Sequence, residues 1–513
     1  MNARLSALLL TAALVFNACS QGSHAARNGG RNSWTVAGTV RVGNSDEPDS
    51  LNPFYGHNDA SDQVDGLIGG ISKDNLTITL HMRKDAKWAD GVPLTANDWL
   101  FTYHSVMNVA NNVKTTLGWD DIASVQTPDL YTIVVHLKKP DASFLGNLAF
   151  GGAAYPPLPE HVLGKLHDLN RADFNRKPLS SGPFVLKEWN HGSLLSFVPN
   201  PYYFRGKPKV KVLWKVIPDV NTLFNLLQTH EIDVELGVNE NDVPRLSSIH
   251  GITVSKRLIA NWRHMGMNMS RPALKDRRVR LALAEGIDWK WINDTVYHGY
   301  NQLATSDVFP LSWAAPQIPR YNYDQADAKR LLAQAGWTMG PDRLLHRAGQ
   351  TLRLSISTGT NKQENQQAEL QIQSQLHQLG IDIQIHNYPV NVLFDRSGPL
   401  YTGNYDLEWS VNTNGPDPDN ACEWVTSCIP PHGSNDSWLS DPIVDRTAQA
   451  ASETFDTAKR KQLYQQEEMR IHQLVPAVFF YWENEYNAVN SDMKNLRPAA
   501  FIQDTWNAYQ WEM

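Results

Sequence analysis

The sequence has few cysteines and no long hydrophobic segment, and both absences limit the class of protein it can encode. Its 513 residues contain only three cysteines, and its charged residues give a net charge of −7. The longest apolar run, Leu5 to Phe16, is shorter than the roughly 20 residues that a membrane-spanning helix needs. No block of lysine and arginine occurs. This charge balance argues against nucleic acid as a partner.

Catalytic signatures are also missing. The chain has no G-x-S-x-G, H-E-x-x-H, Walker A or G-x-G-x-x-G motif, and its 17 histidines are scattered without metal-ligand spacing. Asp417 and Asp419, in "GPDPDN", form the one conceivable carboxylate pair. Aspartate–proline clusters are typical of turns, and for Asp419 we favour a turn. We therefore expect neither an enzyme nor a protein with a cofactor or a bound metal.

The N-terminus has the pattern of an export signal. One basic residue, Arg4, precedes the apolar run, and small residues follow before Cys19. Residues 1–18 are therefore predicted to be a signal peptide. Ala18-Cys19 resembles a bacterial lipobox, so we expect Cys19 to be lipidated and residues 19–33 to be a flexible tether. The alternative is ordinary signal cleavage, which would release a free extracytoplasmic protein.

The loop "YDLEWSVNTNGPDPDNACEWVTSCIPPHG", residues 405–433, holds the other two cysteines. In an oxidising compartment, Cys422 and Cys428 are close enough in sequence to form a local disulfide. Two cysteines cannot complete a tetrahedral zinc site alone, and His432 is the only nearby imidazole, so a metal site is the weaker interpretation.

Strand and helix patterns alternate through both halves of the chain. "NLTITLHMRKDAKW" alternates apolar and polar residues, as expected of a strand with one buried face. Thr95 and Asp98 have the spacing of a capping box at a helix start. The length predicts two or three domains, and the alternation predicts mixed α/β lobes.

Several segments together resemble the extracytoplasmic solute-binding proteins of ABC transporters, family 5, the peptide-, oligopeptide- and nickel-binding group. They cover most of the mature chain in order: residues 71–103, "SSGPFVLKEWNHG" with "PNPYYF", "ALKDRRVRLALAEGID", "YDQADAKRLLAQAGW" and "LYQQEEMRIHQLVPAVFFYW". Any one of these segments alone would be a weak match.

The resemblance implies an α/β, bilobed periplasmic-binding-protein-like fold (type II, cluster C) with an inserted extra subdomain. Lobe I would comprise residues 34–54, 156–262 and 475–513. The inserted subdomain would comprise residues 55–155, and lobe III residues 263–474. Ligand would sit between lobes I and III and be enclosed by hinge closure. In most of the family a further strand and turn follow the position of Ile68, whereas this chain continues directly into Gly69.

The resemblance also implies ligand-contacting residues. Peptide binders of the family place a carboxylate three residues after a tryptophan to meet the peptide ammonium. Here the tryptophan is Trp409, but the matching position is Asn412, which lacks the charge. The family's carboxylate-binding arginine is replaced by Gly359-Thr360-Asn361, with Lys362 nearby. We expect ligand contacts from these five residues: Trp409, Asn412, Asn414, Asp417 and Trp262.

The implied function is capture of a peptide-like solute and its delivery to an ABC permease at the membrane, by a monomer on the extracytoplasmic side. A nickel-chelate or oligosaccharide receptor of the same fold is an alternative. An extracytoplasmic hydrolase using Asp417 and Asp419, and a non-transporting sensor or scaffold, are alternatives from other classes.

Overall fold

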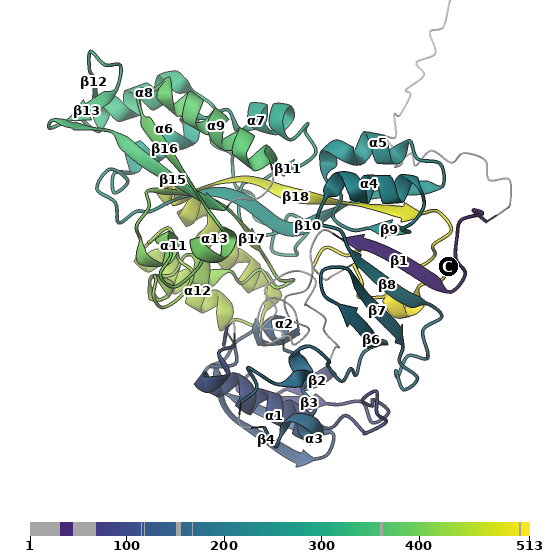
Figure 1. The fold of residues 1–513 in the computed structure, drawn as a ribbon. Coiled ribbons are helices and arrows are strands. Elements are labelled where there is room, and N and C mark those ends of the chain that lie inside the picture. The colour runs from purple at the N-terminus through teal and green to yellow at the C-terminus, as the bar shows by residue number, and fades with distance from the viewer. Residues whose placement is uncertain are drawn as a thin grey trace, which may run out of the picture.

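The computed structural model describes residues 31–44, 68–149 other than 114 and 117, 155–166, 168–359, 363–501 and 504–513. Within these residues the chain forms two large lobes joined by two long strands, with a smaller third body beside them (Figure 1). The joining strands are β10, Ile252–Met267, and β18, Ala477–Asn490, which pair antiparallel. The predicted signal peptide, Cys19 and most of the predicted tether lie outside the described residues.

One mixed sheet runs through both lobes. It has 11 strands in the order β16-β15-β17-β10-β18-β9-β1-β8-β7-β6, with β11 beside β18. The half in lobe I contains β1 Thr39–Asn44, β6 Phe184–Asn190, β7 Leu194–Pro199, β8 Lys211–Val216 and β9 Val234–Glu235. The half in lobe III contains β11 Gln302–Leu303, β15 Arg353–Gly359, β16 Asp382–Tyr388 and β17 Leu407–Thr413.

Helices cover this sheet in both lobes. In lobe I they are α4 Val220–Gln228 and α5 Val243–Ser247. In lobe III, α6 Arg277–Gly286, α7 Trp289–Val296, α8 Gln325–Gln334 and α9 Gln363–His377 lie on one face. The helices α11 Pro399–Thr402, α12 Pro442–Ser452 and α13 Thr457–Leu474 lie on the other, while the single turn α10 Val390–Leu393 contacts β15. A small sheet of β12 Thr338–Met339, β13 Leu345–Arg347 and β14 Gln350–Thr351 completes lobe III.

The inserted subdomain has its own four-stranded antiparallel sheet, in the order β2-β3-β5-β4. Its elements are β2 Ile68–Ile71, β3 Thr77–His81, β4 Ile122–Asp129, β5 Thr132–Leu137, α1 Ala96–Met107, α2 Phe144–Ala149 and α3 Glu160–Leu163. The capping box at the start of α1 is confirmed, because the Thr95 amide donates to Asp98 Oδ2 at 2.8 Å. Ile68 and Gly69, where the family's extra strand is missing, both lie in β2, which pairs with β3.

The core of the inserted subdomain extends beyond residue 155, the end expected from the sequence. Leu158, Leu163, Leu169 and Phe174 are buried with the residues of β3 and β5 in one apolar cluster. These four side chains therefore pack with the subdomain, although the predicted boundary assigned them to lobe I. The mixed α/β architecture with two lobes is confirmed.

Candidate binding site

The loop between β17 and α12, residues 414–441, is fixed to lobe III by a buried ion pair. Both carboxylate oxygens of Asp417 accept hydrogen bonds from the Arg460 guanidinium, at 2.7 and 2.8 Å. Arg460 lies on α13 and is 5% exposed. Its Nε donates to the Ala451 carbonyl of α12 at 3.0 Å. A bidentate pair of this kind fixes both position and orientation of the loop.

Asp307 accepts a second set of hydrogen bonds from the same loop. Trp424 Nε1 donates to Asp307 Oδ2 at 2.8 Å, and Asn420 Nδ2 donates to the Asp307 carbonyl at 3.2 Å. Asn414 Nδ2 also donates to that carbonyl. Asn414 Oδ1 accepts a hydrogen bond from Trp262 Nε1 at 2.8 Å. Trp262 and Asn414, two of the predicted ligand residues, are therefore brought together, and both are buried.

Trp409 lies on the face of β17 opposite to that of Asn412. It is 1% exposed and packs against Trp289 and Phe480 in the main core of lobe III. Asn412, three residues later, is partly buried and donates from Nδ2 to Glu423 Oε2 at 2.8 Å. Strand alternation separates these two positions. The five predicted residues therefore do not line one surface, and their contact with ligand stays a prediction.

The two cysteines of the loop are joined. The structure places a disulfide between Cys422 and Cys428, with the Cα atoms 5.2 Å apart. Gly433 packs directly against this bridge, since a Cβ added there would lie 2.7 Å from Cys422 Sγ. Within the described residues, no group of three or more His, Cys, Asp or Glu side chains is placed to hold a metal ion.

Buried carboxyl groups gather behind the loop. Asp307, Glu467 and Glu468 are each less than 5% exposed. Burial is the first cause that raises the pKa of Glu468, and the neighbouring Asp307 carboxylate raises it further. The raised pKa of Glu468 favours its protonated, neutral form beside Asp307. Burial also raises the pKa of Glu423 to about 8 and that of Asp419 to about 6.

The sequence alone did not predict this cluster, although α13 contains a signal for it. Arg460, Tyr464, Glu467 and Ile471 recur at helical spacing and are all buried. Three polar or charged side chains on the buried face of a helix indicate partners in the interior. For Arg460 that partner is Asp417, which lies 43 residues away in the sequence, whereas Asp307 acts on Glu467 only through space.

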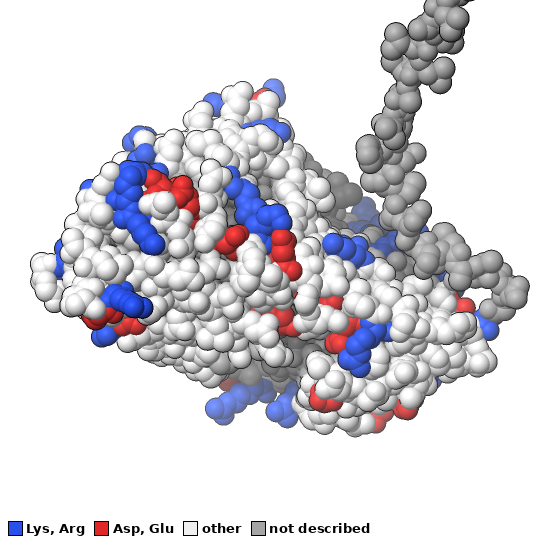
Figure 2. All heavy atoms as spheres, turned by 90° about the horizontal axis from the view of Figure 1, so that it is seen from above, with Lys and Arg blue, Asp and Glu red and all other residues white. Residues whose placement is uncertain are grey.

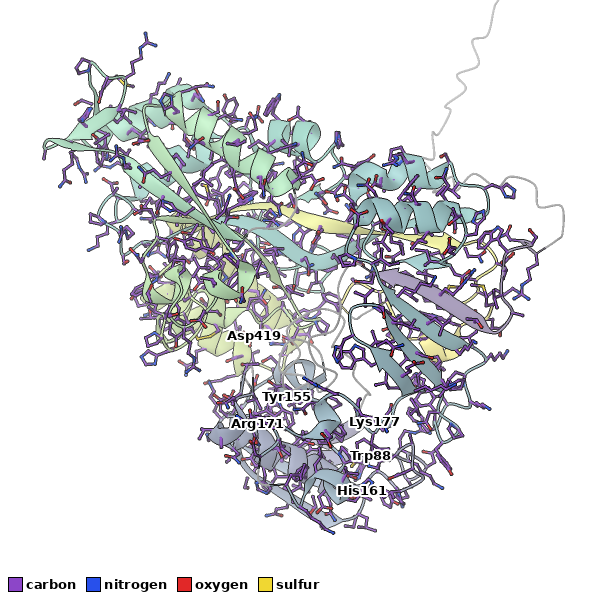
Figure 3. All side chains as sticks on the ribbon, viewed as in Figure 1. Trp88, Tyr155, His161, Arg171, Lys177 and Asp419 are labelled. Atoms are coloured by element: carbon purple, nitrogen blue, oxygen red, sulfur yellow. A yellow bond between two sulfur atoms is a disulfide. The ribbon has the colours of Figure 1, made fainter. Side chains whose placement is uncertain are left out.

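Lobe III contacts the inserted subdomain on one side and lobe I on another. On one side, the Ala142 amide, just before α2, donates to the Ser452 carbonyl of α12 at 2.7 Å. A Cβ added at Gly146 of α2 would lie 3.1 Å from Asp417 Cβ. Figure 3 shows Asp419 at this edge of lobe III, facing the inserted subdomain where Tyr155 and Arg171 are labelled.

On the other side, Glu364 in the first turn of α9 connects lobe III to lobe I. Its Oε1 accepts hydrogen bonds from Asn239 Nδ2 at 3.2 Å and from Asn241 Nδ2 at 2.5 Å. Glu364 is 6% exposed. The segment before it, Thr360–Lys362, lies outside the described residues. These contacts therefore link lobe III both to the inserted subdomain and to lobe I.

Replacing Glu364 with alanine should open the lobes, because each hydrogen bond to a charged acceptor contributes about 1.5–3 kcal/mol. We expect a larger radius of gyration in small-angle X-ray scattering of the unliganded protein. Gln367→Ala, an exposed position on the same helix, is the matched control and should leave the radius unchanged. Identical scattering from the Glu364 variant would show that the bridge does not hold the lobes together.

Pockets, surface charge and helix hydrophobicity describe the remaining surface of the protein. Two small pockets, both partly open to solvent, lie in the fold. The smaller is lined by His264, Glu408, Glu423, Trp424 and Asp436, beneath the disulfide loop. On the face in Figure 2, basic and acidic side chains are interspersed. Within the described ranges, no helix combines the length and apolar character needed to cross a bilayer.

Comparison with known sequences identifies relatives along the whole chain. The family model of the bacterial extracellular solute-binding proteins, family 5 Middle, matches residues 67–430. The oligopeptide-binding protein AppA of Bacillus subtilis is 27% identical over 541 residues, covering 98% of this chain and 97% of AppA. The dipeptide-binding protein of Escherichia coli is 26% identical, covering 83% of this chain and 81% of that protein.

Solved structures share the fold. Bacillus subtilis AppA in complex with a nonapeptide matches with a TM-score of 0.81 at 25% identity, covering 92% of this chain and 98% of AppA. NikZ from Campylobacter jejuni in complex with Ni(L-His) matches with a TM-score of 0.80 at 24% identity, covering 93% of this chain and all of NikZ, 100%. The family model spans more than half of the residues, and the folds agree. The chain belongs to family 5 of the bacterial extracellular solute-binding proteins.

Proposed function

We propose that the protein is the substrate-binding component of an ABC transporter, which captures a peptide-like solute between lobes I and III and delivers it to the membrane permease. The observation that carries the proposal is the end-to-end similarity to AppA, an oligopeptide-binding protein whose solved structure holds a nonapeptide. Strands β10 and β18, which join the lobes, provide the connection about which hinge closure takes place.

Capture would depend mainly on hydrogen bonds to the peptide backbone, which accept many different side chains. A micromolar complex requires only about 8 kcal/mol of net binding free energy, which a water-excluding cleft supplies. Asn412 and Asp417 are partly exposed, and we assign them to direct solute contact. Trp262 and Asn414 are buried, and we assign them to shaping the wall beside these two residues. Trp409 is buried on the opposite face of β17, and we assign it to holding that strand in place.

The protein would release its solute unchanged rather than act as an enzyme. The carboxylate pair of a glycoside hydrolase needs one free nucleophile or base. Both oxygens of Asp417 are already bound by Arg460, so the hydrolase alternative is not favoured. The nickel-chelate alternative has only the shared fold of NikZ to support it.

We further propose that residues 1–18 are removed on export and that lipid on Cys19 tethers a monomer to the outer side of the membrane. The Ala18-Cys19 sequence after an apolar run supports this. A Cys19→Ser variant should therefore move from the membrane fraction to the soluble extracytoplasmic fraction, as followed by immunoblotting. Equal amounts of both proteins in the membrane fraction would argue against the anchor.

The disulfide should support the binding loop. Reducing Cys422–Cys428 is expected to destabilise the loop by about 2–3 kcal/mol, the chain-entropy value for so short a closed segment, and to lower solute affinity. The double variant Cys422→Ser/Cys428→Ser should show the same loss without reductant and no further change with it. Affinity that is unaffected by reductant in the wild type would exclude this supporting role.

The function is tested by titrating refolded, ligand-free protein with defined pools of synthetic peptides in a calorimeter, and by recovering the peptides afterwards. We expect saturable binding with peptides recovered at their original mass. Absence of binding to every pool, or recovery of cleaved fragments, would overturn the proposal.

A further inference from the structure

Arg263 lies in the second half of β10, where the chain crosses from lobe I to lobe III. The residue is 6% exposed. It pairs with Val411 of β17 on one side and with Tyr481 of β18 on the other. Its Nε donates to the Tyr481 hydroxyl at 3.0 Å. Among the described residues this is the one hydrogen bond of the Arg263 side chain, and no carboxylate forms an ion pair with it.

The other two buried arginines of the described chain have complete sets of partners. Arg460 has the bidentate pair with Asp417. Arg280 donates from Nε and both terminal nitrogens to backbone carbonyls at the ends of α6 and α13, including those of Leu274 and Val475. Arg263 instead has two aromatic rings close to its guanidinium, Trp409 at 5.4 Å and Tyr481 at 6.0 Å, and forms no ion pair with a described carboxylate. A buried charge without an anionic partner is destabilising.

The nearby acidic groups are occupied elsewhere. Glu369 of α9 accepts the Thr358 hydroxyl at 2.9 Å, and Glu483 accepts Asn261 Nδ2 at 3.2 Å. Both carboxylates act on Arg263 only through space. The two terminal guanidinium nitrogens thus remain available for an anion that the described chain does not supply.

The position suits a ligand. Strands β15 and β17 are parallel, and Thr358, near the end of β15, is in register with Trp409. Arg263 lies opposite Val411, two residues before the end of β17. Ligands of open α/β sheets bind at the carboxyl ends of parallel strands. Arg263 is therefore a buried cation with few partners, and it lies near the carboxyl ends of β15 and β17, at the junction of the lobes.

We propose that Arg263 is a specificity residue that binds a carboxylate group of the solute through its terminal guanidinium nitrogens. This inference rests on the proposed function, since it assigns a chemical class to the ligand of that same cleft. The planar guanidinium fork matches a carboxylate with two parallel hydrogen bonds. The carboxylate is supplied either by the C-terminus of a peptide or by an acidic side chain.

The test compares three synthetic tripeptide pools by calorimetry: free C-termini without acidic residues, the same sequences as C-terminal amides, and amides that contain Asp or Glu. We expect wild-type protein to bind at least one carboxylate-bearing pool about 10- to 100-fold more tightly than the neutral amides. Arg263→Met should bind all pools at the level of the neutral amides. The pool that loses affinity identifies the source of the carboxylate.

Arg263→Met must also leave the unliganded fold intact, because methionine fills the space without the buried charge. We expect an unchanged or higher melting temperature and partial recovery of affinity in Arg263→Lys. The control Arg353→Met removes an exposed arginine at the start of β15 and should bind like wild type.

Failure of the Arg263 inference and failure of the proposed function would give different results. If Arg263→Met binds the carboxylate pools as wild type does, or if its melting temperature falls sharply, Arg263 has a structural role and the inference is overturned while the proposed function stands. If wild-type protein binds none of the three pools, both the Arg263 inference and the proposed function are contradicted.

Discussion

Replacing Arg460 with methionine should lower the free energy of unfolding by about 3–5 kcal/mol, the cost of leaving one member of a buried ion pair without its partner. Asp417 would lose both of its guanidinium hydrogen bonds while remaining packed against Gly146. Asp419 would lose a nearby positive charge as well. The measurement is equilibrium urea unfolding of the two proteins under the same conditions.

Two further variants make the result specific. Lys459→Met removes the same charge from the exposed neighbouring position of α13 and should change stability by less than about 0.5 kcal/mol. Adding Asp417→Asn to Arg460→Met should restore part of the loss, because the unpaired carboxylate is then removed. If Arg460→Met unfolds at the same urea concentration as Lys459→Met, the ion pair does not anchor the loop.

The second large effect concerns pH. Glu468→Gln should make the protein less sensitive to rising pH, because burial raises the pKa of Glu468 and favours its neutral carboxyl, and glutamine is neutral without a proton to lose. In the wild type, the folded state keeps this proton, whereas the unfolded chain releases it near the ordinary pKa of 4.5. The folded state thus binds more protons above that pH, so stability falls as the pH rises.

One such proton changes the free energy of unfolding by about 1.4 kcal/mol per pH unit. From pH 5 to pH 7, the stability of Glu468→Gln relative to wild type should therefore rise by about 2–3 kcal/mol. The exposed Glu453→Gln serves as the control and should follow the wild-type curve. Parallel pH curves for wild type and Glu468→Gln would mean that Glu468 is already ionised in the folded protein.

Local patterns made much of the fold predictable. Strand β3 and the start of α1 follow from alternation and capping, which depend on neighbours in sequence. The length of β10 was not predictable in this way. Residues Trp262 to Met267 are buried throughout, so the strand lacks an alternating pattern. The place of Leu158 and Phe174 in the subdomain core depends on tertiary packing alone.

The site was predictable only where its partners are close in sequence. Cys422 and Cys428 lie six residues apart and are joined in the structure. Asp417 and Arg460 are 43 residues apart, and nothing near Asp417 indicates its partner. The burial of Trp409 depends on Trp289 and Phe480, which come from other elements. The one sequence feature that indicates a special role for Arg263 is its position as a single arginine within the mostly apolar stretch "NWRHMGM".

The central claim is that two lobes enclose a small peptide-like molecule and release it unchanged. Native mass spectrometry of the protein purified without denaturation tests this most directly. The account predicts a population heavier than the bare chain by the mass of one peptide, which dissociates intact on activation. A spectrum that shows only the bare chain, even after incubation with peptide pools, or one in which the added peptides are cleaved, would contradict it.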